Sequence, residues 1–453
     1  MPNQKKHGYD LESPDSAKTF RTVHYLGSKL RILDFIKEVV DELDPEKSGV
    51  CDLFSGSGSV SQHLSAERRI VSVDIQQYSN VICSALLNPI NNAFVNAFVD
   101  KVKDSGKVAR NLSSFKEIIE FEEHLIIDNS TNDLEKVCNF VENCSLYSAL
   151  ESVPKTASNQ LRKALNSSIK TIANTEDNSF LVIKYFGGLY FSYKQAAHLD
   201  AILECINESD EKYRNILLAA LLSTASDIVN TVGKQFAQPV RPRNKNGQPK
   251  SGIVKQLRKD RILDVLVIYK NWLEKYSIRK VKSLNHEIFR LDYKDALDRL
   301  DDSVGVVYAD PPYTRDHYSR FYHGLETLCL GDHPIISKTN IGGASRLSRG
   351  LYREDRHQSE FCIKSKAPHA FEVLFDKVSK SNKILLLSYS PYDKEKGAHP
   401  RVVELEFLES LASKYFRNVE VRSPGKFSHS KLNRTGLHLE SEDISEILLV
   451  CSN

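Results

Sequence analysis

The sequence predicts an α/β protein in which a parallel sheet is interrupted by a long helical insertion. Two observations lead to this prediction. Short apolar runs of strand length alternate with helical segments up to about residue 90, and strands return after about residue 280. Between these regions the periodicity is mainly helical, as in the segment YRNILLAALLSTASDIVNTV. We therefore expect an α/β domain made of residues 20–90 and 281–453, an insertion over 91–280, and a polar lead-in over 1–19.

The individual elements follow from the same patterns. Residues 29–43 carry apolar side chains at helical spacing, 50–54 (VCDLF) form a buried strand, 59–66 begin a helix, and 70–74 (IVSVD) form the next strand. The short links between them imply a parallel, right-handed crossover. Beyond the insertion, strands are expected at 287–291, 304–309, 383–389 and 444–451.

Composition excludes several classes of protein. Hydrophobic residues make up 41% of the chain and charged residues 27%, which is ordinary for a soluble globular protein. No apolar run reaches the ~18 residues of a membrane span; the run 180–186 (FLVIKYF) has only the length of a strand. The N-terminus lacks the apolar core of a signal peptide. The eight cysteines include no C-x-x-C pair, which disfavours a metal site or a disulfide scaffold and indicates buried thiols in the cytoplasm.

The most informative stretch is Asp310-Pro311-Pro312-Tyr313, directly after the apolar run 304–309. The two prolines fix φ and donate no hydrogen bonds, so the turn is rigid and its carbonyl oxygens are free to accept. An amino group on a planar base needs two acceptors for its N–H groups and an aromatic ring for stacking. The simpler alternative is a strand that ends in a Pro-Pro turn with a capping aspartate.

A glycine loop lies nearer the N-terminus, where the segment DLFSGSGSV turns from a strand into a helix. Gly56 and Gly58 permit positive φ and let a ligand approach the backbone. Asp74 ends the next strand, where a carboxylate can accept both hydroxyls of a ribose. A dinucleotide fingerprint would have a third glycine at position 61, but the residue is Ser61. This difference favours a nucleoside without phosphates, such as S-adenosylmethionine.

Taken together, these motifs resemble those of the N6-adenine-specific DNA methyltransferases of the Dam-like, alpha motif order. Tyr25-Leu26-Gly27-Ser28-Lys29 resembles the Tyr-x-Gly-x-Lys motif of that family, and DPPY its catalytic motif. Leu291-Asp292-Tyr293 resembles an Asp-Phe/Tyr element near the adenine of the cofactor, and Ser388-Tyr389-Ser390 a late strand end. The likeness runs in order over residues 25–451, with its specific motifs confined to the α/β part.

The resemblance implies a Rossmann-like class I methyltransferase sheet, mostly parallel with one antiparallel strand, and S-adenosylmethionine as cofactor. It also implies methylation of adenine in double-stranded DNA, since cytosine-N4 enzymes usually carry Ser in place of Asp310. Target recognition would lie in the helical insertion, and a restriction endonuclease or another defence protein is a possible partner. No metal is required. The implied catalytic residues are Asp310, Pro311, Pro312 and Tyr313. The implied cofactor-binding residues are Tyr25, Lys29, Asp52, Phe54, Gly56, Gly58, Asp74, Asp292 and Asp310.

Charge along the chain points to a polyanion. The segment 234–261 holds nine basic residues and one acid, a net charge of about +8. The segment YSRFYH after DPPY interleaves aromatic and basic side chains, as walls that contact nucleic acid do. The mixed-charge stretch with Arg353, Arg356 and His357 could also contact phosphates. For all three segments, the alternative to a nucleic-acid contact is an ordinary solvated or half-buried surface. The predicted DNA contacts are Lys234, Arg241, Arg243, Lys245, Lys250, Tyr318 and Arg320.

Two other functions fit part of the pattern. Methyltransferases that act on RNA bases or on a glutamine amide use closely related Pro-Pro-Tyr turns. A non-catalytic DNA-binding subunit could retain the scaffold of a methyltransferase. The basic insertion and the complete motif order favour DNA as substrate, and the intact Asp310, Gly56 and Gly58 favour an active enzyme.

Overall fold

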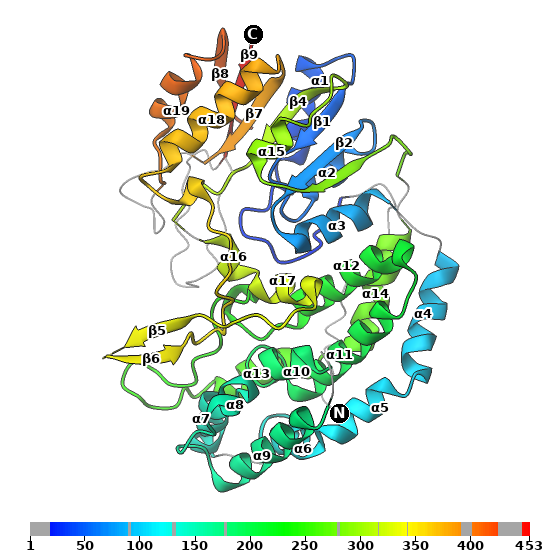
Figure 1. Cartoon of the computed structure of the whole chain (residues 1–453), viewed down its shortest axis with the longest axis vertical. Helices are drawn as coiled ribbons and strands as arrows, with labels where there is room; N and C mark the ends of the chain where they lie inside the picture. Colours follow the sequence, from blue (N-terminus) through cyan, green and yellow to red (C-terminus); the bar gives the residue numbers. More distant parts are fainter. Residues whose placement is uncertain are drawn as a thin grey trace, which may run out of the picture.

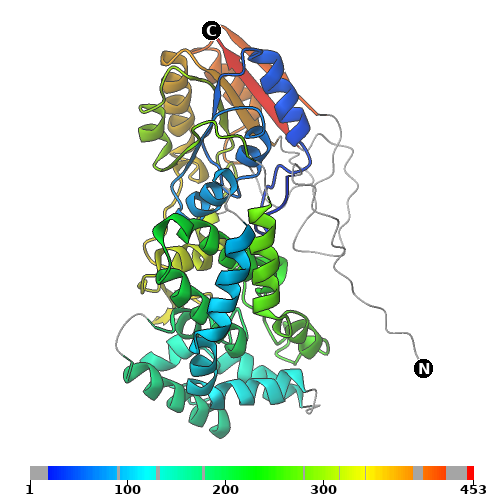
Figure 2. The same ribbon diagram turned by 90° about the vertical axis from the view of Figure 1, so that its right-hand side faces the viewer.

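The computed structural model describes residues 19–88, 92–128, 133–175, 179–278, 281–315, 317–341, 343–390, 401–424 and 446–453. The predicted polar lead-in falls almost entirely outside the described residues. Figures 1 and 2 both show a sheet with its flanking helices at one end of the long axis and a mainly helical part at the other.

The sheet has seven strands in the order β3-β2-β1-β4-β7-β9-β8. Neighbouring strands are parallel except for β9, which runs antiparallel to both β7 and β8. The predicted class I methyltransferase sheet with one antiparallel strand is therefore confirmed. The strands are β1 (Gly49–Asp52), β2 (Ile70–Asp74), β3 (Glu287–Arg290), β4 (Val304–Ala309), β7 (Ile384–Tyr389), β8 (Asn418–Arg422) and β9 (Ile447–Ser452).

Helices cover both faces of the sheet, so its central strands are apolar on both sides. In β4, Val306 and Tyr308 pack against α1 and α2, whereas Val307 and Ala309 face the core formed with α15, α18 and α19. The helices of this part are α1 (Leu33–Leu43), α2 (Ser59–Leu64), α3 (Gln77–Leu87), α15 (Tyr293–Leu297), α18 (Ala367–Lys380) and α19 (Leu405–Ala412), with the 3₁₀ turn η3 (Glu360–Cys362).

The helical part contains most of the segment between β2 and β3. Its elements are α4 (Asn92–Asp104), α5 (Lys107–Ser114), α6 (Lys116–Glu122), the π-helical η1 (Glu123–Ile127), α7 (Leu134–Asn143), α8 (Leu146–Glu151), α9 (Asn159–Ala173), α10 (Leu181–Phe186), α11 (Tyr193–Asn207), α12 (Glu211–Ile228), η2 (Val232–Lys234), α13 (Ile253–Arg261) and α14 (Val265–Ser277). The strand-length run at 180–186 is thus largely a helix, which lies in the helical core. A short apolar run can form either a buried helix or a buried strand, so its sequence alone does not distinguish them.

Residues from the C-terminal half also join the helical part. These elements are α16 (Tyr318–Phe321), α17 (His323–Leu330) and the hairpin of β5 (Lys338–Ile341) and β6 (Ala344–Leu347). Tyr322, Leu325 and Leu328 are members of the same hydrophobic core as α10, α11 and α12, and Figure 1 shows α17 beside α12. The helical layer therefore extends beyond the segment 91–280.

All eight cysteines are buried as free thiols, as predicted from the sequence. Among the described helices, none has both the length and the apolar character needed to cross a membrane.

Candidate active site

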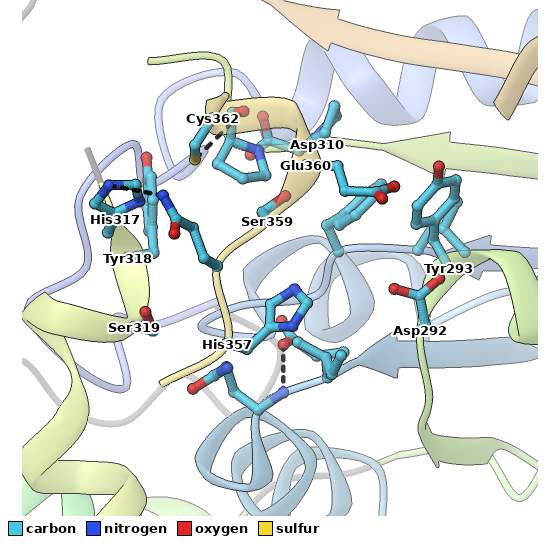
Figure 3. A pocket seen from close by; sticks show the side chains of 18 of the residues that line it. Asp292, Tyr293, Asp310, His317, Tyr318, Ser319, His357, Ser359, Glu360 and Cys362 are labelled. Atoms are coloured by element: carbon cyan, nitrogen blue, oxygen red, sulfur yellow. Dashed lines mark hydrogen bonds between the residues drawn. The ribbon is translucent and has the colours of Figure 1, made fainter. Parts of the chain in front are cut away.

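A cavity of about 320 Å³ opens at the carboxyl ends of β1, β2, β3 and β4, within the size range of small-molecule sites. Each of these strands contributes a residue that lines it: Phe54 after β1, Asp74 from β2, Asp292 after β3 and Asp310 after β4. Ligands of open parallel sheets bind at this edge. The segment that follows Asp52 and the Asp310-Pro311-Pro312 corner therefore share one cavity, which Figure 3 shows from close by.

The glycine loop lies behind one end of the cavity: Leu53 and Phe54 line it, whereas Gly56 and Gly58 do not. Gly56 and Gly58 both adopt positive φ, +51° and +72°. A Cβ atom on Gly56 would lie 2.6 Å from the hydroxyl oxygen of Tyr25, so only glycine allows this tyrosine to pack against the loop. The N–H of Gly56 donates to Oδ2 of Asp74 at 2.9 Å, and the N–H of Gln76 donates to Oδ1 at 2.8 Å. The loop thus fixes the carboxylate of Asp74 at the cavity wall.

Asp292 and two aromatic rings extend this end of the cavity. Asp292 caps α15 by accepting a hydrogen bond from the backbone N–H of Lys294 at 3.0 Å. The ring centroid of Phe54 lies 5.9 Å from that of Tyr293 and 5.5 Å from that of Phe361. Two carboxylates beside an aromatic wall can accept hydrogen bonds from hydroxyl groups and pack against a planar ring.

Asp52 lies behind the cavity and does not line it. Its Oδ2 accepts hydrogen bonds from the N–H of Ser61 at 3.0 Å and from the Ser61 hydroxyl at 2.6 Å. Burial raises the pKa of Asp52 to about 7, and the bonds from Ser61 oppose that shift. Asp52 therefore secures the first turn of α2 and, through it, the shape of the glycine loop.

At the other end of the cavity, Lys29 lies between two carboxylates. Its ammonium is 2.8 Å from Oδ2 of Asp310 and 2.8 Å from Oε1 of Glu446. Burial acts to lower the pKa of Lys29, but the two carboxylates outweigh it and raise the pKa well above its ordinary value, so Lys29 stays charged. Burial raises the pKa of Asp310 to about 6; Lys29 opposes this shift and Glu446 adds to it.

Glu446 was not found by sequence reasoning. It stands just before β9, and its Oε1 also accepts a hydrogen bond from the hydroxyl of Ser388 at 3.1 Å. A glutamate beside an apolar strand carries no signal of its own, because its partner Lys29 is far away in the sequence.

The residues at and after the Asp310-Pro311-Pro312 corner differ in whether they face the cavity. Pro311, Pro312 and Tyr318 line the cavity, whereas Tyr313 does not. The Tyr313 ring packs 5.2 Å from that of Tyr389, with the guanidinium of Arg401 4.9 Å from its centroid. Tyr318 therefore offers an aromatic ring to the cavity within electrostatic reach of Asp310, and Figure 3 shows it on the same side as His317.

A mostly polar strip, residues 357–360 with Cys362, crosses the cavity between the Asp310 and Asp292 sides (Figure 3), and Phe361 within it packs into the core. Glu360 pairs with Lys294 at 2.7 Å, and Gln358 lies 3.2 Å from a ring nitrogen of His317. Apart from His357, sequence reasoning missed this strip, since loop residues of this kind form no pattern. In the part of the chain that the structure describes, no group of histidine, cysteine and acidic side chains is arranged to hold a metal ion.

The predicted DNA contacts from the basic segment fall into two groups. Lys234 is paired with Asp260 at 2.7 Å, and Arg243 with Glu135 and Glu142, each at 2.8 Å. Arg241 and Lys245 are exposed, and the ammonium of Lys250 donates to the carbonyl of Arg241 at 2.7 Å.

The segment YSRFYH is divided between cavity and core. Tyr318 lines the cavity, and the guanidinium of Arg320 lies 5.9 Å from the ring centroid of Tyr352. Tyr322 and His323 are 2% and 1% exposed, which disfavours the suggested contact of these two side chains with nucleic acid. Both side chains belong to the packing of α17 against the helical part.

Comparison with known proteins places this geometry in a family. Residues 25–180 and 258–386 match the D12 class N6 adenine-specific DNA methyltransferase family. The chain is 23% identical over 444 residues to modification methylase LlaI of Lactococcus lactis subsp. lactis. The aligned region covers 94% of this chain and 54% of that protein. It is 24% identical over 376 residues to type II methyltransferase M.FokI of Planomicrobium okeanokoites, covering 81% of this chain and 44% of the relative.

The chain thus spans about half the length of the curated relatives that it matches. The family match itself covers well over half of the chain and includes the glycine loop, Asp74, Asp292 and Asp310. The chain belongs to the family of D12 class N6 adenine-specific DNA methyltransferases.

Proposed function

We propose that this protein transfers a methyl group from S-adenosylmethionine to the N6 amino group of adenine in double-stranded DNA. The observation that carries the proposal is the single cavity lined by Asp74 and Asp292 at one end and by the Asp310-Pro311 corner at the other. A nucleoside cofactor and an amino group can then be held in one enclosed space, as in-line transfer between them requires.

The residues at the first end fit the cofactor. Each carboxylate oxygen of Asp74 already accepts one backbone N–H, and each keeps a second lone pair for a ribose hydroxyl. Phe54 and Tyr293 supply an apolar wall for the adenine ring. S-adenosylmethionine, when bound, supplies an electrophilic methyl group on sulfur.

The residues at the second end fit the substrate amine. Oδ2 of Asp310 is paired with Lys29, which leaves Oδ1 to accept one N–H of the amino group. The carbonyl of Pro311, which accepts no hydrogen bond from any described residue, would accept the other. Accepting both hydrogens directs the nitrogen lone pair toward the methyl group, because the amine is drawn out of conjugation with its ring.

The target adenine must leave the duplex to reach this cavity, at a cost of a few kcal/mol. We assign the stacking surface to Tyr318, which lines the cavity. Stacking by Tyr313, the residue predicted from the sequence, would require its ring to leave the contacts with Tyr389 and Arg401.

The wider setting is also a proposal. One relative is named a modification methylase and the other a type II methyltransferase, which supports a role in restriction and modification with an endonuclease as partner. We place target recognition in the helical part, including residues 318–352, and the protein in the cytoplasm, in keeping with its buried free thiols.

The test is incubation with labelled S-adenosylmethionine and unmodified DNA, followed by nucleoside analysis. Label in N6-methyladenine is the expected result. Label found only in 4-methylcytosine, in RNA or in protein would refute the proposed substrate. Calorimetry without DNA distinguishes an active enzyme from a non-catalytic subunit, which would not bind the cofactor.

A further inference from the structure

Five arginines from three separate segments gather beside the hairpin of β5 and β6. Arg241, Arg346 and Arg349 line a second cavity of about 660 Å³. Arg320 and Arg356 lie 5.9 and 5.3 Å from the ring centroid of Tyr352. We name these residues the arginine cluster: Arg241, Arg320, Arg346, Arg349 and Arg356.

Tyr352 joins the two halves of the arginine cluster. Its hydroxyl donates a hydrogen bond to the carbonyl of Ala237, which fixes the ring. Burial raises the pKa of Tyr352, and the charges of Arg320, Arg356, Arg349 and Arg241 all oppose that shift. Four guanidinium groups are therefore within electrostatic reach of one phenol, and two of them lie over its ring, where cation–π attraction holds them.

The arginine cluster has no carboxylate partner at ion-pair distance among the described residues. Its neighbours differ in this respect: Arg243 pairs with Glu135 and Glu142, and Arg261 with Glu122. Arg349 instead donates to the carbonyl of Val240 at 2.9 Å, and Arg356 to the hydroxyl of Ser337 at 3.4 Å. Nε of Arg320 is buried and has no hydrogen-bond partner within the part of the chain that the structure describes.

Such an arrangement is unfavourable for the protein on its own, because like charges repel and a buried guanidinium N–H loses its bond to water. Burial lowers the pKa of Arg349, and the charge of Arg241 lowers it further. Among the described residues, nearby arginines have acidic partners at ion-pair distance and these five do not. Glu142 and Asp355 act on Arg349 and Arg356 only over longer distances, so a ligand is best suited to supply the missing negative charge.

The position of the arginine cluster identifies that ligand as extended. A third cavity, lined by Arg353, Arg356, Ser319 and His357, continues from Arg356 toward the active site. Ser319 and His357 also line the catalytic cavity. In this third cavity Glu326 and Asp355 pair with Arg290 and Arg353, whereas Arg356 has no such partner among the described residues. Arginine side chains therefore continue from the β5–β6 hairpin, past Tyr352, to the place where the target base would enter.

We propose that the arginine cluster binds successive phosphates of double-stranded DNA beside the adenine that enters the catalytic cavity. Guanidinium groups suit this task because they form paired hydrogen bonds to phosphate oxygens. These contacts position the duplex and read no sequence. The inference rests on the proposed function and assigns part of the DNA-binding surface to residues 320–356, beyond the segment 91–280 in which recognition was predicted.

The test uses the whole chain with the double substitution Arg241→Gln and Arg346→Gln, because both side chains are exposed and removing them leaves no buried group unpaired. Fluorescence anisotropy with a labelled mixed-sequence duplex measures the binding constant over a range of salt concentrations. We expect the slope of log K against log salt to decrease by about 2, roughly one unit for each lost phosphate contact. Affinity at moderate salt should fall roughly tenfold or more.

Two control variants separate local from general charge effects. Arg162→Gln removes an exposed charge from α9 and should leave the slope unchanged. Arg243→Gln removes a guanidinium already neutralised by two glutamates, so it should decrease the slope by less than half as much as the double variant does. An equal slope for the double variant and the wild type would overturn the inference. An equal decrease of the slope in the double variant and in both control variants would also overturn it. So would tighter binding of RNA than of duplex DNA with the same dependence on these arginines.

The outcome is distinguishable from that of the proposed function. If the wild-type protein forms N6-methyladenine but the slope of the double variant is unchanged, the proposed phosphate site is refuted and the proposed reaction is supported. If the slope of the double variant is reduced but the wild-type protein does not methylate adenine, the phosphate site is supported and the proposed reaction is refuted.

Discussion

The ammonium of Lys29 lies 2.8 Å from Oδ2 of Asp310, with Lys29 5% exposed beneath the cavity and Asp310 21% exposed at its wall. The pairing engages one carboxylate oxygen of Asp310, and in the proposed reaction the other oxygen would accept from the substrate amine. It also keeps the carboxylate ionised near neutral pH, although burial raises the pKa of Asp310 to about 6. The ionised carboxylate can accept at both oxygens, whereas protonation turns one oxygen into a donor and weakens the group as an acceptor for an amino N–H.

Replacing Asp310 with alanine should abolish methyl transfer while the affinity for S-adenosylmethionine falls much less. The shape-preserving variant Asp310→Asn should lose about 10²- to 10³-fold in kcat, the usual cost of a displaced transition-state contact. Lys29 keeps Glu446 as a partner at 2.8 Å, so neither change leaves its buried charge unpaired. Single-turnover assays and calorimetry measure the two effects. Activity equal to wild type in Asp310→Ala would exclude this residue from the mechanism.

The pH dependence of the reaction should report the carboxylate of Asp310. If the ionised form accepts the amine, kcat falls as the pH drops through the pKa of about 6. Glu446 contributes to raising that pKa, so Glu446→Gln should move the acid limb of the profile to lower pH. Glu406→Gln, an exposed change on α19, serves as the control. A limb that stayed in place or moved upward in Glu446→Gln would contradict the assigned coupling.

The sequence predicted the sheet well where strands are buried on both faces. The apolar run 304–309 has the same bounds as β4, because a central parallel strand is apolar without alternation. The edge strand β8, NVEVR, is mostly exposed and has no such run, so it was missed. The run at 180–186 was apolar for another reason: α10 is surrounded by other helices, and periodicity cannot distinguish that environment from a strand.

The site was predictable where residues follow strand ends and unpredictable where distant segments meet. Asp74, Asp292 and Asp310 line one cavity because each stands at or just beyond the end of a parallel strand. Glu446 depends on a long-range pairing with Lys29. The side on which Tyr313 and Tyr318 lie depends on the path of the chain after the two prolines, which no local pattern specifies.

Asp74→Asn should weaken cofactor binding by about ten- to a hundredfold, because the two backbone N–H groups of Gly56 and Gln76 would face only one acceptor oxygen. Affinity for duplex DNA should stay unchanged, since Asp74 lies at the cofactor end of the cavity. Asp295→Asn, on the exposed side of α15, is the matched control. Calorimetry with S-adenosylmethionine checks the prediction, and equal affinity in the Asp74 and Asp295 variants would show that Asp74 does not hold the ligand.

A comparison of Gly56→Ala with Gly106→Ala should separate backbone strain from packing at the glycine loop. Both glycines have positive φ, so both substitutions carry the strain cost of about 1 kcal/mol. At Gly106 the new methyl group meets nothing within 4 Å, whereas at Gly56 it meets the Tyr25 hydroxyl at 2.6 Å.

We expect a small loss of unfolding free energy for Gly106→Ala and unchanged cofactor binding. Gly56→Ala should lose more stability and at least tenfold in cofactor affinity, because Tyr25 must move and the loop that orients Asp74 moves with it. Thermal unfolding with and without S-adenosylmethionine measures both. Equal ligand-induced stabilisation of the two variants would mean that the Tyr25–Gly56 contact has no part in binding the cofactor.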